Sequence, residues 1–128
     1  MQDRPDSGEL LDAIADFLRG QANEATDRWH RFQFQVAANS LTILSREFKQ
    51  EDSHLENDWR HLDNLLGEEV RPAQRPDLVA ALRRRHEELC SGIRAGEFDA
   101  PEREAELLEF LWQTVTDKVA ITNPKELR

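Results

Sequence analysis

The chain has 128 residues, and its 17 basic and 26 acidic side chains give a formal net charge of −9. This length suits a single domain over residues 1–128 and is too short for two independent cores. The net acidity disfavours nucleic acid and anionic membranes as partners. No segment approaches the roughly 20 apolar residues of a membrane span, and the single cysteine, Cys90, excludes an internal disulfide. We therefore expect a soluble, cytoplasmic protein.

The charge is distributed unevenly along the chain. Residues 31–50 carry three basic and one acidic side chains, whereas residues 51–70 carry one basic and seven acidic ones. Helices of opposite sign could lie side by side, or an acidic face could meet a basic partner. A solvated acidic surface is the simpler explanation, since each screened surface charge contributes little energy.

Apolar residues recur at intervals of three and four along the whole chain, a spacing that predicts amphipathic helices. The first helix is expected over residues 7–19. Asp6 and Glu9 form a capping-box pattern at its start, and Gly20 follows at a position typical of a helix end.

The second helix, expected over about residues 26–49, has two apolar stripes, which imply neighbours on both sides. Asn39 falls on the first stripe, so we expect it to be at least partly buried and hydrogen-bonded, because an unpaired buried amide costs about 1–3 kcal/mol. The alternative is that Asn39 contacts a ligand or a partner. Small residues at 37–40 would let another helix approach closely. The first stripe comprises Trp29, Phe32, Val36 and Ile43, and the second Phe34, Ala37, Leu41, Leu44 and Phe48.

A third helix is expected to open at Ser53 and end at Gly67, because Ser53 and Glu56 form a second capping-box pattern. Either a true turn or only a kink at residues 50–52 would separate it from the second helix. A loop over residues 68–75 follows.

Two more helices complete the chain. Pro76 suits the first turn of a helix that reaches about residue 93 and is stopped by Gly96. The last helix begins near Pro101, with Asp99 as its cap, and ends at Asn123, and its broad apolar surface suggests a central position. Five helices with short connections predict an all-α, single-domain bundle.

His54, Asp58 and His61 lie at i, i+4 and i+7 on one edge of the expected third helix. Imidazole and carboxylate groups at this spacing could hold a divalent metal. A dinuclear bundle site, however, needs Glu-x-x-His motifs from two helices, and the sequence lacks a second one. We therefore expect these residues to form a solvated flank, with no metal and no other cofactor.

The remaining candidates for chemistry lie in the fourth helix. Arg83, Arg84 and Arg85 could bind an anion or a partner. Arg83 and Arg84 can instead pair with glutamates four residues on, whereas Arg85 lies near the apolar stripe. Cys90 follows His86 by four residues, so a nucleophile and base are possible, but a small buried residue is the commoner role of cysteine. We expect no catalytic site.

Four blocks of the sequence, in this order and spacing, resemble a small bacterial family of unassigned function. The first contains Asp3, Arg4 and Pro5, and the second contains Asn39. The third spans Arg94 and Glu97, and the last runs from Lys118 through Asn123 to Pro124. The blocks cover residues 2–19, 34–47, 93–99 and 118–124.

Members of that family are encoded beside, or fused to, kinases of the aminoglycoside-phosphotransferase type, often with acyl-CoA dehydrogenases. One branch is similar to the small subunit of a kinase that phosphorylates 4-hydroxyacyl-CoA. The resemblance thus implies a non-catalytic accessory subunit in the catabolism of hydroxy- or keto-acids as acyl-CoA. The kinase would be the main partner and the dehydrogenase a further candidate.

The polar residues of the shared blocks are the expected partner-binding residues, because several of them lie outside helix interiors, where loops commonly carry function. An alternative is a stand-alone helical module that self-associates or binds a small acyl ligand between helices. The expected partner-binding set is Asp3, Arg4, Pro5, Asn39, Arg94, Glu97, Lys118 and Asn123.

Overall fold

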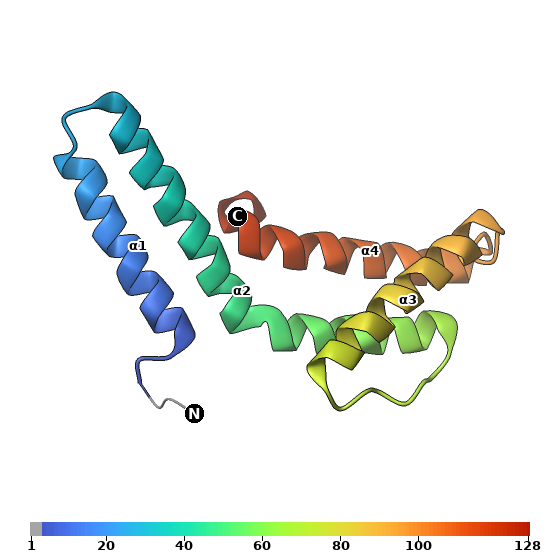
Figure 1. Cartoon of the computed structure of the whole chain (residues 1–128). Coiled ribbons are helices and arrows are strands. Elements are labelled where there is room, and N and C mark those ends of the chain that lie inside the picture. The colour runs from blue at the N-terminus through green and yellow to red at the C-terminus, as the bar shows by residue number, and fades with distance from the viewer. Residues whose placement is uncertain (1–3) are drawn as a thin grey trace. The chain divides into compact units, whose positions relative to one another are not determined.

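The computed structural model describes residues 4–128, and these residues form helices and connecting loops without a β-strand (Figure 1). The all-α class is therefore confirmed. In the part of the chain that the structure describes, four α-helices replace the five that were predicted. Of these helices, none is long and apolar enough to span a membrane. The helices are α1 (Ser7–Glu24), α2 (Arg28–Leu66), α3 (Arg75–Arg94) and α4 (Pro101–Thr122), followed by the short 3₁₀ helix η1 (Pro124–Leu127).

The number of helices differs because the second and third predicted helices form the single helix α2, which has 39 residues. The capping-box interpretation of Ser53 and Glu56 was wrong, since both residues lie inside this helix. A cap requires the chain to leave the helical conformation first. Residues 50–52 contain no glycine or proline that would force it to do so.

Helix α1 begins where the sequence predicts and ends later. The Asp6 carboxylate accepts a hydrogen bond from the Glu9 amide at 2.8 Å, and the Glu9 carboxylate accepts one from the Asp6 amide at 2.9 Å. This capping box was predicted and is confirmed. Gly20, in contrast, does not end the helix. The helix continues to Glu24 and thereby buries Ala22 against α2.

Two glycines end helices as predicted. Gly67 follows α2 with φ of +99°, and Gly96 follows α3 with φ of +79°, a backbone region that side chains rarely tolerate. Pro76 lies in the first turn of α3. At the start of α4, Ala100 accepts the first helical hydrogen bond, from the Glu104 amide. The predicted cap, Asp99, therefore lies one residue too early.

The described chain divides into two compact units. The first contains residues 4–51 together with Ile121–Glu126, and the second contains Asp52–Ala120. The boundary falls inside α2, which contributes its N-terminal part to the first unit and its C-terminal part to the second. That the whole chain forms one domain stays a prediction.

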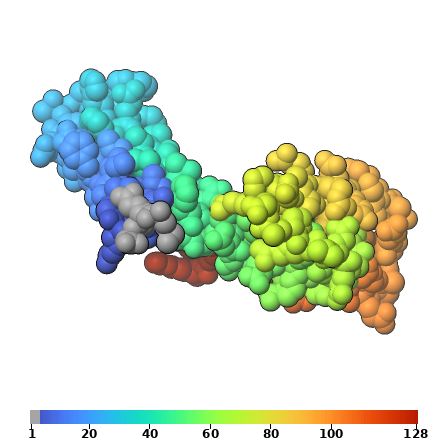
Figure 2. Space-filling model, turned by 60° about the horizontal axis from the view of Figure 1, so that its bottom comes forward, coloured from blue at the N-terminus to red at the C-terminus, as the bar shows by residue number. Residues whose placement is uncertain are grey.

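The second unit has a conventional apolar core. It consists of the C-terminal part of α2, together with α3 and α4, and α3 lies directly against α2 in both views (Figures 1 and 2). Large side chains from all three helices pack together there, which is the main source of stability for such a unit. The core residues are Trp59, Leu62, Leu65, Leu78, Leu82, Leu89, Phe98, Leu107 and Phe110.

Candidate functional site

The first unit contains a helical hairpin, in which α1 and the N-terminal part of α2 contact each other through small side chains. Gly8, Ala15 and Ala22 are buried and spaced by seven residues along α1. Ala38 and Ser45 are buried and spaced by seven on α2. Residues seven apart lie almost on one line of a helix. The Ser45 hydroxyl donates a hydrogen bond to the Gly8 carbonyl at 3.3 Å, so these residues form one seam.

Of the small residues 37–40, which were predicted to let another helix approach closely, only Ala38 is buried in the seam, at 0% exposed, whereas Asn39 and Ser40 are exposed. The seam also shows which residues produce the close crossing. The predicted stripes contain large side chains, whereas the seam contains glycine, alanine and serine. Small side chains let two helices approach closely, and the large ones are left outside the contact.

One side of the seam is polar. The Arg19 guanidinium donates to the Thr42 hydroxyl at 2.6 Å, and the Lys49 ammonium donates to the Asp12 carboxylate at 2.6 Å. Each of these four residues follows a seam residue by four positions. The hydrogen bond from Lys49, followed by one from Ser45, lowers the pKa of Asp12.

The other side of the seam is apolar. Because the positions four residues after the seam meet on the polar side, the positions three residues after it lie on the opposite side. These positions and their neighbours present an uncharged surface, which we call the open face. It comprises Leu10, Leu11, Ile14, Phe17 and Leu18 of α1 and Phe34, Ala37, Leu41, Leu44 and Phe48 of α2.

Large parts of the open face are accessible to solvent. Phe17 is 64% exposed and Phe48 is 60% exposed, and Leu10, Ile14 and Leu44 are exposed as well. The hairpin thus buries mainly alanine, glycine and serine and leaves its large apolar side chains in water. Burial of the open face against a partner would be favourable, since burial of apolar surface contributes about 25 cal/mol per Å².

The N-terminal part of the first predicted stripe of α2 also lacks a neighbour among residues 4–128. Trp29, Phe32 and Val36 are exposed, and the rings of Trp29 and Phe32 stack at 6.2 Å between centroids. The expectation of neighbours on both sides of this helix was therefore wrong for its N-terminal part. The predicted central position of the last helix holds on one face only, since Leu107 is buried whereas Trp112 is exposed.

The N-terminal members of the expected partner-binding set are only partly available. Asp3 lies outside the described residues. Pro5 is exposed. The Arg4 guanidinium donates a hydrogen bond to the Glu9 carboxylate, which belongs to the capping box of α1. Arg4 precedes α1 in the sequence, but this contact supports the start of the helix.

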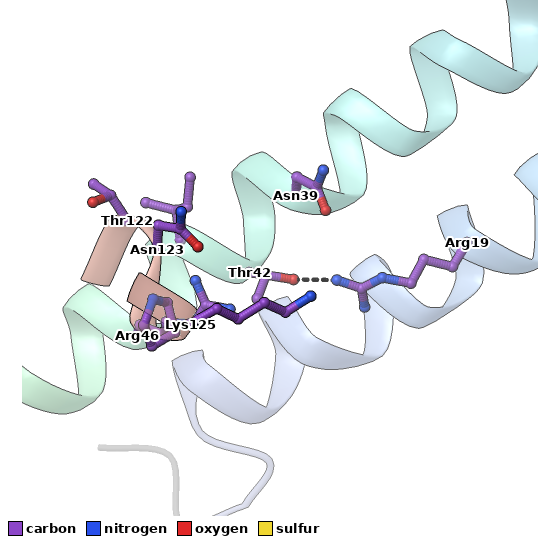
Figure 3. A pocket seen from close by; sticks show the side chains of 9 residues that line it. Arg19, Asn39, Thr42, Arg46, Thr122, Asn123 and Lys125 are labelled. Atoms are coloured by element: carbon purple, nitrogen blue, oxygen red, sulfur yellow. Dashed lines mark hydrogen bonds between the residues drawn. The ribbon is translucent and has the colours of Figure 1, made fainter. Parts of the chain in front are cut away.

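Asn39 is exposed, so the prediction that it is at least partly buried was wrong. The reason is the seam, which runs through Ala38 and turns the next residue outward. Asn39 and the expected residue Asn123 instead line the same cavity of about 500 Å³ (Figure 3). Three basic residues that the sequence analysis missed, Arg19, Arg46 and Lys125, line it too. These three residues come from distant segments of the sequence. The only sign of a basic cavity in the sequence was the net positive charge of residues 31–50.

The other expected residues belong to the second unit. Arg94 ends α3, and Glu97 follows Gly96 in the turn before α4, as the sequence predicts. Both side chains are exposed. Lys118 is also exposed, but it lies about 25 Å along α4 from Pro101, at a rise of about 1.5 Å per residue. These residues therefore do not form one cluster within the second unit.

The histidines and carboxylates of the metal hypothesis have separate partners. His54 lies 3.7 Å from Asp117, and Asp58 lies 3.0 Å from His86. His61 contacts the Asn57 carbonyl at 2.8 Å. Among residues 4–128, no group of three or more histidine, cysteine or acidic side chains is arranged to hold a metal ion.

The candidates in α3 have different surroundings. Cys90 is exposed, so the expectation of a buried cysteine was wrong. Arg84 lies 3.7 Å from Glu88, as predicted, and 2.7 Å from Glu69, which lowers the pKa of Glu69. Arg83 forms no such pair with any residue of the described chain. Arg85 is buried beside the apolar core, as its place near the stripe suggested.

The described residues form an all-helical fold, and its first unit contains an apolar face and a basic cavity. Residues 24–126 match a family described as a domain of unknown function, DUF6285, and the chain belongs to that family. Comparison with curated proteins and with solved structures gave no match.

Proposed function

We propose that the chain is a non-catalytic interaction subunit of a phosphotransferase-type kinase that acts in the catabolism of hydroxy- or keto-acids as acyl-CoA, and that it binds this kinase through the open face. The kinase as partner rests on the resemblance of residues 2–124 to proteins encoded beside such kinases. The open face provides the structural support, because it is a broad apolar surface of the hairpin that residues 4–128 leave accessible to solvent.

The observation that carries the proposal is the mismatch between what the hairpin buries and what it exposes. Helix α1 has 18 residues and is about 27 Å long. Two helices of that length, side by side, present a projected area on the order of 500 Å². Apolar patches of about 300–600 Å² are the largest on a typical monomer and are often functional. A partner that supplies apolar side chains would bury this patch.

A second copy of the chain is the alternative occupant of the open face. The face carries no charged side chain, so two acidic chains would not place like charges against each other across it. Two such faces together would bury on the order of 1,000 Å², which reaches the lower limit of a specific interface. The kinase is the preferred occupant because the resemblance points to it.

Co-purification with the adjacent kinase tests the proposal. The variant Ile14→Gln/Leu44→Gln places two polar amides on the open face, and Trp29→Gln/Val36→Gln is the matched control on the first apolar stripe of α2, outside the open face. We expect the open-face variant to lose co-elution with the kinase, and the control to retain it. Both variants should keep the helical circular dichroism of the wild type, since all four positions are exposed.

Two outcomes would contradict the proposal. Normal co-elution of the open-face variant would show that the kinase binds elsewhere or not at all. A stable dimer of the isolated chain that dissociates in the open-face variant, and that the kinase does not disrupt, would assign the face to self-association. Analytical ultracentrifugation of the chain with and without the kinase distinguishes these results.

A further inference from the structure

We propose that the cavity between α1, α2 and residues 121–126 binds the phosphate group of a small phosphorylated metabolite. Its volume of about 500 Å³ falls within the range of small-molecule sites, about 300–1,000 Å³. All of its lining residues belong to the first unit. Figure 3 shows that its polar side chains come from α1, α2, the end of α4 and η1.

The charge of the cavity is opposite to that of the chain. Arg19, Arg46 and Lys125 line it, and no acidic residue does, although the chain carries a net charge of −9. Arg19 lies 3.3 Å from Asp16, which offsets one of these charges. Within the described chain, neither Arg46 nor Lys125 forms an ion pair. Two positive charges in one cavity repel each other, and a bound anion relieves that repulsion.

The donors are held in position by the fold. The Arg19 guanidinium is fixed by its hydrogen bond to Thr42 at 2.6 Å. Arg46 donates one N–H to the Ile121 carbonyl at 2.9 Å, which places its guanidinium beside the last turn of α4. A guanidinium has five N–H donors, so the remaining donors of Arg46 are available to a ligand.

A phosphate group matches this donor set better than a carboxylate does. A phosphate monoester carries about −1.5 to −2 charges at neutral pH and three acceptor oxygens. It can therefore accept hydrogen bonds from Arg46 and Lys125 together. The amide of Asn39 is a further donor, as is the second N–H of the Asn123 amide, whose nitrogen also donates to Glu126. The cavity is larger than one phosphate, and Ile43 and Pro124 supply an apolar wall for the organic part of the ligand.

Titration of the full-length chain, without any kinase, tests this inference independently of the proposed function. The probes are inorganic phosphate, pyrophosphate, phenyl phosphate and acetate, added at constant ionic strength. The readout is the nuclear magnetic resonance signal of the side-chain amides of Asn39 and Asn123. We expect saturable shifts with the three phosphates and none with acetate. Phenyl phosphate should bind more tightly than inorganic phosphate because its ring contacts the apolar wall.

Two variants distinguish specific binding in the cavity from non-specific attraction of anions to positive charge. Lys125→Ala removes a cation whose ammonium forms no ion pair within the described chain, and we expect it to weaken phenyl phosphate binding by about fivefold to tenfold. Arg28→Gln removes a cation of the same unit outside the cavity and should leave binding unchanged. Equal weakening in both variants, shifts with acetate, or no saturable shift would overturn the inference. Equal affinities for phenyl phosphate and inorganic phosphate would overturn the claim that the apolar wall binds the organic part of the ligand.

Discussion

The guanidinium of Arg85 lies 2.8 Å from the carboxylate of Asp63, although the Arg85 side chain is only 1% exposed. The same guanidinium donates to the Gly67 carbonyl at 2.6 Å and lies 4.5 Å from the centre of the Trp59 ring. Arg85 therefore binds the end of α2 to the middle of α3. A buried charge is tolerated only when it is paired and hydrogen-bonded in this way.

Truncation of Arg85 should strongly destabilise the second unit. We expect Arg85→Ala to lower the free energy of unfolding by about 3 kcal/mol, because Asp63 and the Gly67 carbonyl lose the guanidinium as a donor and a cavity opens beside Trp59. Thermal unfolding followed by circular dichroism measures the effect. The matched control is Arg83→Ala, two residues earlier on the exposed surface, which should change it by less than about 0.5 kcal/mol. Similar small effects of both variants would show that the buried network is not a source of stability.

Close packing at the seam gives a second prediction. Ala38→Leu adds a branched side chain where α1 and α2 touch, and overpacking of this kind costs about 1–3 kcal/mol. Asn39→Leu adds the same side chain at the next position, which is exposed. It should therefore change the free energy of unfolding by less than about 0.5 kcal/mol. Chemical denaturation of both variants checks this, and a larger loss for Asn39→Leu would contradict the seam.

Much of the fold follows from the sequence because its signals are local. The Asp6–Glu9 capping box and the ends of α2 and α3 at Gly67 and Gly96 depend on a few neighbouring residues, and these predictions are confirmed. Signals that depend on a tertiary contact were misleading. Gly20 resembles a helix end, yet α1 continues because Ala22 packs against α2, which outweighs the weak helix propensity of glycine.

The site was harder to predict than the fold. Sequence analysis assigns large apolar residues to the core, but the hairpin of the first unit buries Ala15 and Ala38 and exposes Phe17. Which side chains are buried depends on how closely the two helices approach each other, and no single residue type specifies that distance. Likewise, Arg19 and Lys125 are more than one hundred residues apart in the sequence and meet only because residues 121–126 lie beside the hairpin.

The Asp12–Lys49 contact should make the hairpin sensitive to acid. Hydrogen bonds from Lys49 and Ser45 lower the pKa of Asp12 below its ordinary value of 3.8. The folded chain thus favours the ionised carboxylate. The stabilisation is fully present above the pKa of the unfolded chain and is lost as the pH falls through the lower pKa of the folded chain.

A pair of charge-removing variants measures this effect. At about pH 6, Asp12→Asn should unfold at a lower temperature than the wild type, and the difference should shrink as the pH falls through the lowered pKa of Asp12. Glu47→Gln is the control, since Glu47 forms no ion pair within residues 4–128. A difference between wild type and Asp12→Asn that is independent of pH would show that the carboxylate charge does not stabilise the hairpin.

The sequence blocks that resemble the bacterial family also contain residues outside the open face, and these residues are expected to contribute to kinase binding. Arg94 gives the most specific test of the expected partner-binding set, because its side chain is exposed and forms no ion pair or side-chain hydrogen bond within the described chain. Arg94→Ala should therefore leave thermal unfolding unchanged and weaken co-elution with the kinase. Arg4→Ala is a less specific test, since Arg4 also supports the capping box through Glu9. It should lower stability by up to about 1 kcal/mol, as the loss of an exposed ion pair does. Normal kinase binding by Arg94→Ala, measured beside the open-face variant, would exclude the turn between α3 and α4 from the kinase-binding surface.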